Sequence, residues 1–460
     1  MAFSSFYFLF LFLPIFFGIY YYVPARGRNW VLLIGSLAFY IIGSYDAPEH
    51  LILLLLSILL DFYLGCAMER FPRRKKILLW SGLTIHLGAL AFFKYFNFAA
   101  SELHRLTEMP LLPEILLPMG ISFYTFQGIS YLVDVYRGKI RAERSLLRFS
   151  VFISMFEQLI AGPIVTYDQV QKSLSRRRIT SKHRSSGLGT FLFGLGLKVL
   201  LANPLGKLFA QVQNIGFESI STPLAWMAIT AFSLQLYLDF YGYSIMAQGL
   251  GRMMGFRIPR NFYFPYLSCS MTEFWRRWHI TLGSWFREYV YIPLGGNRKG
   301  VGRTVCNLLA VWMLTGLWHG AGYNFLLWGL SLGLILMGEK FLYGAFLQAH
   351  RLAGHLYMLV LIPVTWSIFA IEQLPQLGMF LRKLFFLGPA PLSSGDFLKY
   401  AKLYWPFLLA GILFSTPIPY QLLRCIRSKY IQWGFLLLVF GGCVYLLYMG
   451  LNDPFLYFRF

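Results

Sequence analysis

Apolar runs long enough to cross a bilayer recur along almost the whole chain, with short polar loops between them. A membrane-spanning helix needs about 20 consecutive, mostly apolar residues. The pattern predicts an all-α, polytopic membrane protein with about eleven transmembrane helices and additional re-entrant segments. The apolar runs lie near residues 3–23, 30–45, 50–68, 77–96, 115–136, 188–212, 222–250, 305–318, 321–341, 355–371, 404–416 and 431–450.

The charges in the first loops indicate how the chain crosses the membrane. Loops rich in Arg and Lys alternate with more acidic loops: 24–29, 69–76 and 137–148 are basic, whereas 46–49 and 97–114 are acidic. Because basic loops face the cytoplasm, we expect the N-terminus to lie outside it. We also expect Met1–Val23 to be the first span rather than a cleaved signal peptide, since it lacks a basic n-region and a small-residue cleavage site.

One apolar run, 149–166, breaks this alternation. It begins after one basic loop and ends before another at 172–184, and it contains Glu157, Gln158 and the pair Gly162-Pro163. Irregular backbone at membrane depth is tolerated only where protein encloses it or where it lines a wet cavity. We therefore predict a broken, re-entrant segment with both ends on the cytoplasmic side.

The composition favours one compact membrane domain over residues 1–460. The chain is 13% charged, whereas soluble proteins carry about 25% charged residues. Its formal net charge of +22 fits basic cytoplasmic loops beside anionic lipid headgroups, so we expect membrane lipid and no nucleic acid as a partner. The scattered cysteines show no C-x-x-C spacing, which argues against a disulfide framework or a thiolate metal site.

The most polar part of the chain is 251–303, and within it residues 274–289 are predicted to form one amphipathic helix. Aromatic and aliphatic side chains fall on one face and charged side chains on the other, which is typical of a helix at a membrane interface. His279 lies at the edge of the apolar face. It is either a histidine that reaches polar headgroups or a functional residue.

A second histidine, His319, lies between two strongly apolar runs and is a functional-site hypothesis, because an ionisable group at membrane depth is costly. The structural alternative is a histidine hydrogen-bonded between helices. Imidazole can remove the proton of a hydroxyl that attacks a thioester near neutral pH. A second imidazole can orient the acceptor or stabilise the oxyanion, and a water-poor site protects the thioester. Gly316, Gly320 and Gly322 allow close helix approach or a broken helix.

Other polar groups inside the apolar runs keep a secondary transporter open as a different class. Most of them fit interhelical hydrogen bonding, and no inverted repeat is visible. The chain also lacks the G-x-S-x-G, H-E-x-x-H and Walker A signatures, which argues against serine hydrolases, zinc peptidases and P-loop enzymes. The polar residues are Asp61, His86, Gln127, Asp134, Gln235 and Asp239.

An ordered set of motifs covers residues 117–460: LPMGISFYTFQG (117–128), VDVYRG (133–138), QLIAGP (158–163), LYLDFYGYSIMAQGLGRMMG (236–255), NFYFPY (261–266), EFWRRWHITLGSWFREYVYIPLGG (273–296), GLWHG (316–320) and DPFLYFRF (453–460). This set resembles the membrane-bound O-acyltransferase (MBOAT) family, specifically its alginate O-acetyltransferase (AlgI-like) branch. We therefore expect an MBOAT core over residues 117–460, preceded by N-terminal helices over residues 1–116.

The resemblance implies a fold and functional roles. It implies a ring of tilted helices around a central funnel or tunnel. It also implies that His319 is the essential histidine and general base, and that His279 is a second catalytic residue. Residues implied for the substrate and donor tunnel are Trp275, Arg276, Trp278 and Asp239.

By the same resemblance, the acyl group, expected to be acetyl, comes from a cytoplasmic thioester and reaches an extracytoplasmic polysaccharide. The donor substrate is acetyl-CoA or a carrier-protein thioester, and we expect no bound cofactor and no metal. The basic residues Arg276, Arg277, Arg298 and Lys299 suit such an anionic donor. The expected partners are acyl-CoA or an acyl carrier protein and a separate extracytoplasmic acetyltransferase, and the expected location is the bacterial inner membrane.

Alternatives remain at this point. Within the family, D-alanyl transfer to teichoic acid (DltB-type) and peptidoglycan O-acetylation are open. Outside it, a secondary transporter predicts ion flux, and a non-catalytic scaffold predicts that His319→Ala changes nothing in polysaccharide acetylation.

Overall fold

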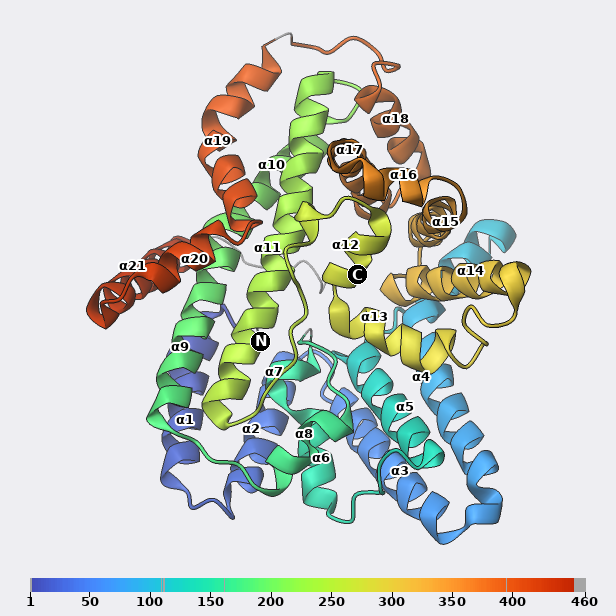
Figure 1. The fold of residues 1–460 in the computed structure, drawn as a ribbon, viewed down its shortest axis with the longest axis vertical. Helices are drawn as coiled ribbons and strands as arrows, with labels where there is room; N and C mark the ends of the chain where they lie inside the picture. The colour runs from blue at the N-terminus through green and yellow to red at the C-terminus, as the bar shows by residue number, and fades with distance from the viewer. Residues whose placement is uncertain (1, 109, 111, 161, 394, 451–460) are drawn as a thin grey trace. The chain divides into compact units, whose positions relative to one another are not determined.

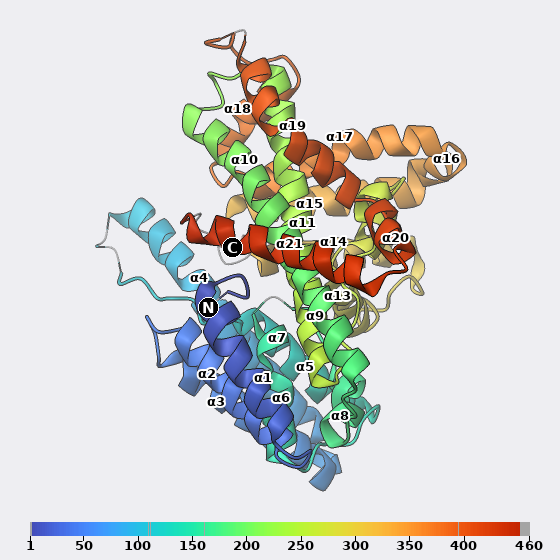
Figure 2. The ribbon, with the colours of Figure 1, turned by 90° about the vertical axis from the view of Figure 1, so that its left-hand side faces the viewer.

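The computed structural model describes residues 2–450 except 109, 111, 161 and 394 (Figures 1 and 2). Every regular element in this part of the chain is a helix, which confirms the predicted all-α fold class. The chain divides into two compact units, one of Met1–Phe191 with Ser244–Pro259 and one of Leu192–Tyr243 with Arg260–Phe460. Each unit is described by itself below, and the single domain over residues 1–460 stays a prediction.

Eight helices in the described part are long and apolar enough to cross a membrane, which supports a multi-pass protein. The total of about eleven spans and the ring around a funnel stay predictions. The eight segments are His50–Arg70, Pro72–Thr107, Ser181–Ile215, Gly300–His319, Tyr323–Ala349, Arg351–Ala370, Asp396–Phe414 and Lys429–Tyr448, with shorter apolar helices at Tyr7–Tyr22 and Arg28–Gly43.

In the first unit, α3 (His50–Arg70), α4 (Lys75–Thr107) and α5 (Ile121–Arg137) pack against one another (Figure 1). Asp61 and His86 form a buried pair between α3 and α4, with 2.7 Å from Oδ1 to Nε2. Gly128 of α5 faces this pair, because a Cβ there would lie 2.9 Å from His86 Nε2. These polar groups therefore satisfy each other between helices. The other elements are η1 (Tyr7–Phe12), α1 (Leu13–Tyr22), α2 (Arg28–Gly43), η2 (Pro72–Arg74), α6 (Leu146–Ser154), α7 (Phe156–Leu159), α8 (Tyr167–Ser175), most of α9 (Ser181–Gly196) and the end of α11 (Thr222–Met254).

The segment 149–166 is interrupted, as predicted. Helix α6 ends at Ser154, α7 is a single turn, and the described residues between α7 and α8 belong to no regular helix. Gly162 allows a close turn, because a Cβ there would lie 2.5 Å from the Cα of Gln158. Glu157 and Gln158 are 0% and 1% exposed. The break is confirmed, whereas entry and return on the cytoplasmic side stay a prediction.

A buried carboxylate, Glu143, ties the loop before α6 to α8. Its Oε1 accepts hydrogen bonds from the Ser145 backbone N–H at 2.7 Å and from the Arg148 guanidinium at 2.6 Å, and its Oε2 accepts one from the Tyr167 hydroxyl. Burial raises the pKa of Glu143, but these hydrogen bonds and the charge of Arg148 outweigh burial and hold the pKa below its ordinary value. The ionised form therefore stabilises this loop.

The second unit carries both candidate histidines. Helices α14 (Gly300–His319) and α15 (Tyr323–Gly338) pack against each other, and glycines make this close packing possible. A Cβ at Gly329 of α15 would lie 2.5 Å from the carbonyl oxygen of Trp312 on α14. The other elements are η3 (Leu197–Ala202), α10 (Asn203–Ile215), the first part of α11, η4 (Pro265–Leu267), α12 (Met271–Arg277), α13 (Ile280–Phe286), η5 (Arg287–Tyr291), η6 (Glu339–Tyr343), α16 (Gly344–Ala349), α17 (Arg351–Ala370), α18 (Leu374–Leu384), α19 (Asp396–Phe414), α20 (Ile418–Cys425) and α21 (Lys429–Tyr448).

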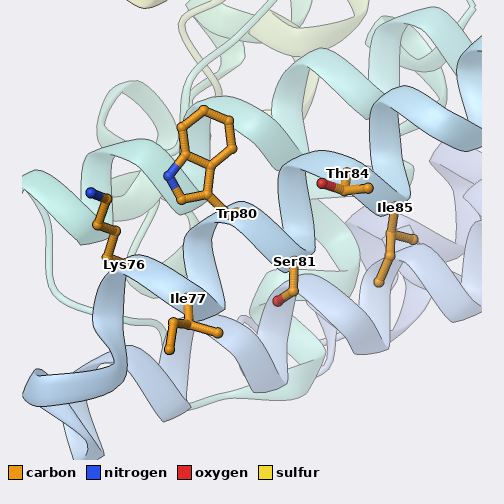
Figure 3. Close-up of a pocket in the computed structure, with 6 residues that line it drawn as sticks. All are labelled: Lys76, Ile77, Trp80, Ser81, Thr84 and Ile85. Carbon is orange, nitrogen blue, oxygen red and sulfur yellow. The ribbon is translucent and has the colours of Figure 1, made fainter.

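A pocket on the exposed side of α4 is drawn in Figure 3. Its lining comes from this one helix, and Ile77, Trp80 and Ile85 are each more than half exposed. It contains neither a histidine nor a carboxylate, so it is not the candidate active site. The lining residues are Lys76, Ile77, Trp80, Ser81, Thr84 and Ile85.

Candidate active site

The amphipathic helix predicted over residues 274–289 is two short helices with a break at His279. Helix α12 ends at Arg277 and α13 begins at Ile280. His279 has φ 42° and ψ 53°, a left-handed conformation that is rare outside glycine and often found at functional sites. The prediction of one continuous interfacial helix was therefore wrong. Its apolar face is packed inside the second unit, where the buried side chains include Phe274, Trp278, Leu282, Trp285 and Phe286.

Asn261 holds the chain in this broken form. Its backbone carbonyl accepts a hydrogen bond from the Ile280 N–H at 2.8 Å. Its side-chain Oδ1 accepts hydrogen bonds from the backbone N–H and the hydroxyl of Thr281, at 3.3 and 2.9 Å. The same Oδ1 lies 3.1 Å from His279 Nδ1. Since a backbone N–H can only donate, this atom is the amide oxygen, and His279 Nδ1 carries the hydrogen.

His279 therefore presents a lone pair on Nε2. The side chain is 2% exposed, and Nε2 has no hydrogen-bond partner among the described residues. The Phe240 ring stands perpendicular to the imidazole at 4.8 Å. The histidine lies outside the eight candidate spans. Burial lowers the pKa of His279 well below its ordinary value, and the nearby His319 lowers it further. The imidazole is consequently neutral near pH 7.

His319 is the last residue of α14 and has the same tautomer. Its Nδ1 lies 2.8 Å from the carbonyl oxygen of Thr315, one turn earlier. Because a carbonyl oxygen only accepts, Nδ1 carries a hydrogen, so that in the neutral imidazole the lone pair is on Nε2. The helix stops directly after it, since Gly320 is extended, with φ −171° and ψ 164°. Of the two alternatives that the nearby glycines allowed, the structure shows both, since α14 ends at His319 and a Cβ at Gly316 would lie 2.4 Å from the Phe325 carbonyl oxygen.

Aromatic side chains bring the two histidines into one buried group. The Trp318 ring lies 6.2 Å from the His279 ring and 4.8 Å from the His319 ring, between centroids. Trp328 lies 4.8 Å from His319 on another side. Further ring contacts extend this group to α12 and α17. We call it the aromatic cluster: Trp275, Trp278, Trp312, Trp318, Trp328, Trp366 and Phe369.

The other predicted site residues are placed in different ways. Trp275 and Trp278 belong to the aromatic cluster, and Trp278 is 3% exposed. Arg276 is exposed. Asp239 on α11 forms a buried ion pair with Lys198, with 2.7 Å from Oδ1 to Nζ. Its neighbour in sequence, Phe240, makes the contact with His279. The tunnel roles of these residues stay predictions.

Sequence reasoning missed Glu339, which holds the start of α12. Its carboxylate accepts hydrogen bonds from the backbone N–H of Met271 at 2.5 Å and of Thr272 at 2.7 Å. It also accepts hydrogen bonds from the Thr272 hydroxyl at 2.6 Å and the Tyr357 hydroxyl at 3.2 Å. These bonds satisfy N–H groups that the first turn of a helix leaves without partners. Glu339 therefore fixes the helix that carries Trp275 and leads to His279.

The roles of Asn261, Trp328 and Trp366 were also missed. Asn261 stands at the head of a motif, but nothing in the sequence pairs it with a histidine 18 residues later. Trp328 and Trp366 lie in apolar runs, where a tryptophan is an ordinary packing residue. Among the described residues, no group of three or more His, Cys, Asp or Glu side chains is placed to hold a metal ion.

Comparison with known proteins shows which family the chain belongs to. The model of the membrane-bound O-acyltransferase family matches residues 139–371, which include both histidines. A Pseudomonas putida protein named probable alginate O-acetylase AlgI is 39% identical over 406 residues, covering 86% of this chain and 82% of the relative. The chain belongs to the MBOAT family. It is therefore a multi-pass membrane O-acyltransferase, as the motifs predicted.

Two other relatives of this MBOAT protein have different names. A peptidoglycan O-acetyltransferase of Helicobacter pylori is 34% identical over 387 residues, covering 76% of this chain and 70% of the relative. A teichoic acid D-alanyltransferase of Bacillus subtilis is 28% identical over 236 residues, covering 48% of this chain and 59% of the relative. The similarity is thus greatest, among these three, to the alginate-type relative.

Proposed function

We propose that this MBOAT protein moves an acetyl group from a cytoplasmic thioester through the bacterial inner membrane for O-acetylation of an extracytoplasmic polysaccharide. The observation that carries the proposal is the pair of buried histidines beside one aromatic cluster, each with Nδ1 held by a carbonyl-type oxygen. The similarity to probable alginate O-acetylases supports acetyl as the acyl group and a polysaccharide as the acceptor.

In this proposal His319 is the general base. Nε2 takes the proton of the attacking hydroxyl while the hydroxyl oxygen bonds to the thioester carbonyl carbon. The carbon–sulfur bond then breaks, and the imidazolium returns the proton to the leaving thiolate, so that ester and free thiol are the products. The Thr315 carbonyl keeps Nδ1 protonated and the ring oriented throughout. The surrounding aromatic rings exclude the water that would hydrolyse the thioester.

His279 is proposed to orient the acceptor, because its Nε2 lone pair can accept a hydrogen bond from a polar hydrogen of the acceptor other than the one that His319 removes. Asn261 keeps this imidazole in the accepting tautomer. A donor of acetyl-CoA or acetyl-carrier type would meet exposed basic residues such as Arg276, Arg298 and Lys299. A separate extracytoplasmic acetyltransferase completes the transfer to the polymer in this proposal.

The test is the ester content of surface polysaccharides in cells that produce wild-type protein, His319→Ala or His350→Ala at equal membrane abundance. His350 is an exposed histidine on the loop between α16 and α17 and serves as the matched control. We expect loss of ester-linked acetate only in His319→Ala. Unchanged acetate and D-alanine esters in that variant would refute the catalytic assignment.

D-alanyl transfer is a second candidate function, and the match to the teichoic acid D-alanyltransferase supports it. The same samples separate the two candidates. Loss of ester-linked D-alanine with unchanged acetate would assign the protein to D-alanyl transfer, whereas loss of acetate from peptidoglycan alone would identify that polymer as the acceptor.

A further inference from the structure

The aromatic cluster contains buried indole N–H groups that lack acceptors among the described residues, and Trp275 and Trp328 are among them. The indole Nε1 atoms of Trp275 and Trp328 are both inaccessible to solvent, and neither has a hydrogen-bond partner among the described residues. By contrast, the indole N–H of Trp226 in the same unit donates to the Leu384 carbonyl oxygen at 2.9 Å. Tryptophan N–H groups usually find an acceptor when buried. Unsatisfied donors that gather in one cluster indicate that a group outside this chain accepts from them.

The position of Trp328 points to the reacting group. Its ring is fully buried and lies 4.8 Å from the His319 ring, between centroids. A hydroxyl oxygen that gives its proton to His319 lies about 3 Å from Nε2, and the attacked carbonyl carbon lies about 3–3.5 Å beyond that oxygen. The carbonyl of a bound thioester therefore falls among the side chains that touch His319, of which Trp328 offers a neutral N–H.

Trp275 is the second hydrogen-bond donor in the aromatic cluster. Its ring lies 5.6 Å from the Trp328 ring. Trp275 comes from α12, whose first turn is held by Glu339. Trp328 comes from α15, which packs closely against α14 because glycines leave room for the approach. Trp366 packs beside both indoles, at 6.2 and 5.9 Å between centroids. Both donors are thus fixed before any ligand arrives, which is what electrostatic stabilisation of a transition state requires.

We propose that the indole N–H groups of Trp328 and Trp275 donate hydrogen bonds to the thioester carbonyl oxygen and stabilise the oxyanion that forms on it. This inference rests on the proposed acyl transfer. When the hydroxyl oxygen bonds to the carbonyl carbon, the π electron pair of the C=O bond moves to the carbonyl oxygen. The hydroxyl proton moves to His319. When the tetrahedral intermediate collapses, the pair returns and the carbon–sulfur bond breaks. The indoles keep their protons throughout, and no further reactant is needed.

The test replaces tryptophan by 3-benzothienylalanine, which keeps the bicyclic ring and substitutes sulfur for the N–H. The full-length protein is purified in nanodiscs with this analogue at position 328, 275 or, as control, 226. Turnover is followed as release of free thiol from acetyl-CoA, with D-alanyl carrier protein as alternative donor. Trp328→Phe provides a second, encoded variant that lacks the N–H.

We expect kcat to fall about 10²-fold or more with the analogue at 328, with KM for the donor within about twofold of wild type because the contact strengthens only as charge develops. The analogue at 275 should lower kcat in the same sense, and the analogue at 226 should leave kcat unchanged. Unchanged kcat at 328, or a rise in KM alone, would overturn the inference.

A second measurement does not depend on turnover. A ketone analogue of acetyl-CoA, labelled with ¹³C at its carbonyl, is bound to each protein, and its infrared stretch is recorded. We expect a lower frequency in wild type than in the variant with the analogue at 328. Equal frequencies would refute the carbonyl contact. If wild type consumes neither donor, the proposed function fails, while the infrared comparison still decides whether the indoles bind a carbonyl.

Discussion

Gly329→Ala tests whether the close packing of α14 on α15 sets the catalytic geometry. The new Cβ would lie 2.5 Å from the Trp312 carbonyl oxygen, whereas ordinary contacts begin at 3.4 Å, so α15 must move by 3.4 − 2.5 = 0.9 Å relative to α14. His319 ends α14, and Trp328 precedes the substituted residue on α15. The methyl group is therefore expected to move Trp328 away from His319, the proposed general base.

The expected magnitudes differ for stability and rate. Overpacking typically destabilises by about 1–3 kcal/mol, and alanine in place of glycine returns up to about 1 kcal/mol of helix propensity. The net loss is therefore about 0–2 kcal/mol, which leaves the protein folded. A displacement of about 1 Å at a reacting centre lowers the rate about 10²-fold. The assay is kcat of acyl transfer by purified protein, together with its thermal unfolding midpoint.

Gly302→Ala is the matched control, because Gly302 is on α14 and a Cβ there meets nothing within 4 Å. We expect this control to keep wild-type kcat and to unfold at an equal or higher temperature. If Gly329→Ala kept kcat within about twofold of Gly302→Ala, the link from helix spacing to rate would be refuted.

Three further substitutions test the supports of the site and of the first unit. Asn261→Ala should lower kcat about 10-fold or more, because His279 loses the acceptor that fixes its tautomer; a pH–rate profile and kcat identical to wild type would contradict this. Glu339→Gln should lower kcat with little change in abundance, since an amide nitrogen opposes one of the two α12 N–H groups; Glu339→Asp should recover part of the rate, and equal loss in both would argue against the specific contact. Glu143→Gln should lower the unfolding temperature at pH 7 by an amount equivalent to about 1–3 kcal/mol. Because the folded pKa of Glu143 is depressed, its contribution is present above the ordinary glutamate pKa and is lost as pH falls through the folded pKa, so the two unfolding curves should converge on acidification.

The membrane class could be predicted from the sequence, and the two histidines could be singled out as candidates, because an apolar run and a buried ionisable group each carry a local free-energy cost. Exposing a long apolar run to water costs free energy wherever the run lies in the fold, so the spans can be recognised in the sequence itself. A histidine such as His319 between apolar runs is costly for the same reason. The interruption after Ser154 was also predictable, since Gly162-Pro163 and two polar side chains lie in one apolar run.

The break at His279 was not predictable, because its cause is remote in the chain. Periodicity over 274–289 fits one helix, and each residue accepts helical geometry locally. The side chain and carbonyl of Asn261 replace the helical hydrogen bonds of Ile280 and Thr281, and they do so only after the chain has folded back. When a distant residue replaces the backbone hydrogen bonds of a helix, the hydrophobic periodicity of the helix sequence does not change.

The sequence by itself therefore determined that this is a membrane protein of the MBOAT family, and it singled out the two imidazoles that are proposed to carry the chemistry. Tertiary structure decided which nitrogen His279 presents, because Asn261, 18 residues earlier, holds its Nδ1. For His319 the acceptor is the Thr315 carbonyl one turn earlier in the same helix, which is a local contact. It also brought Trp275 of α12 against Trp328 of α15, whose ring lies beside His319. An indole in an apolar run satisfies the hydrophobic pattern in any orientation, and only packing fixes where its N–H points.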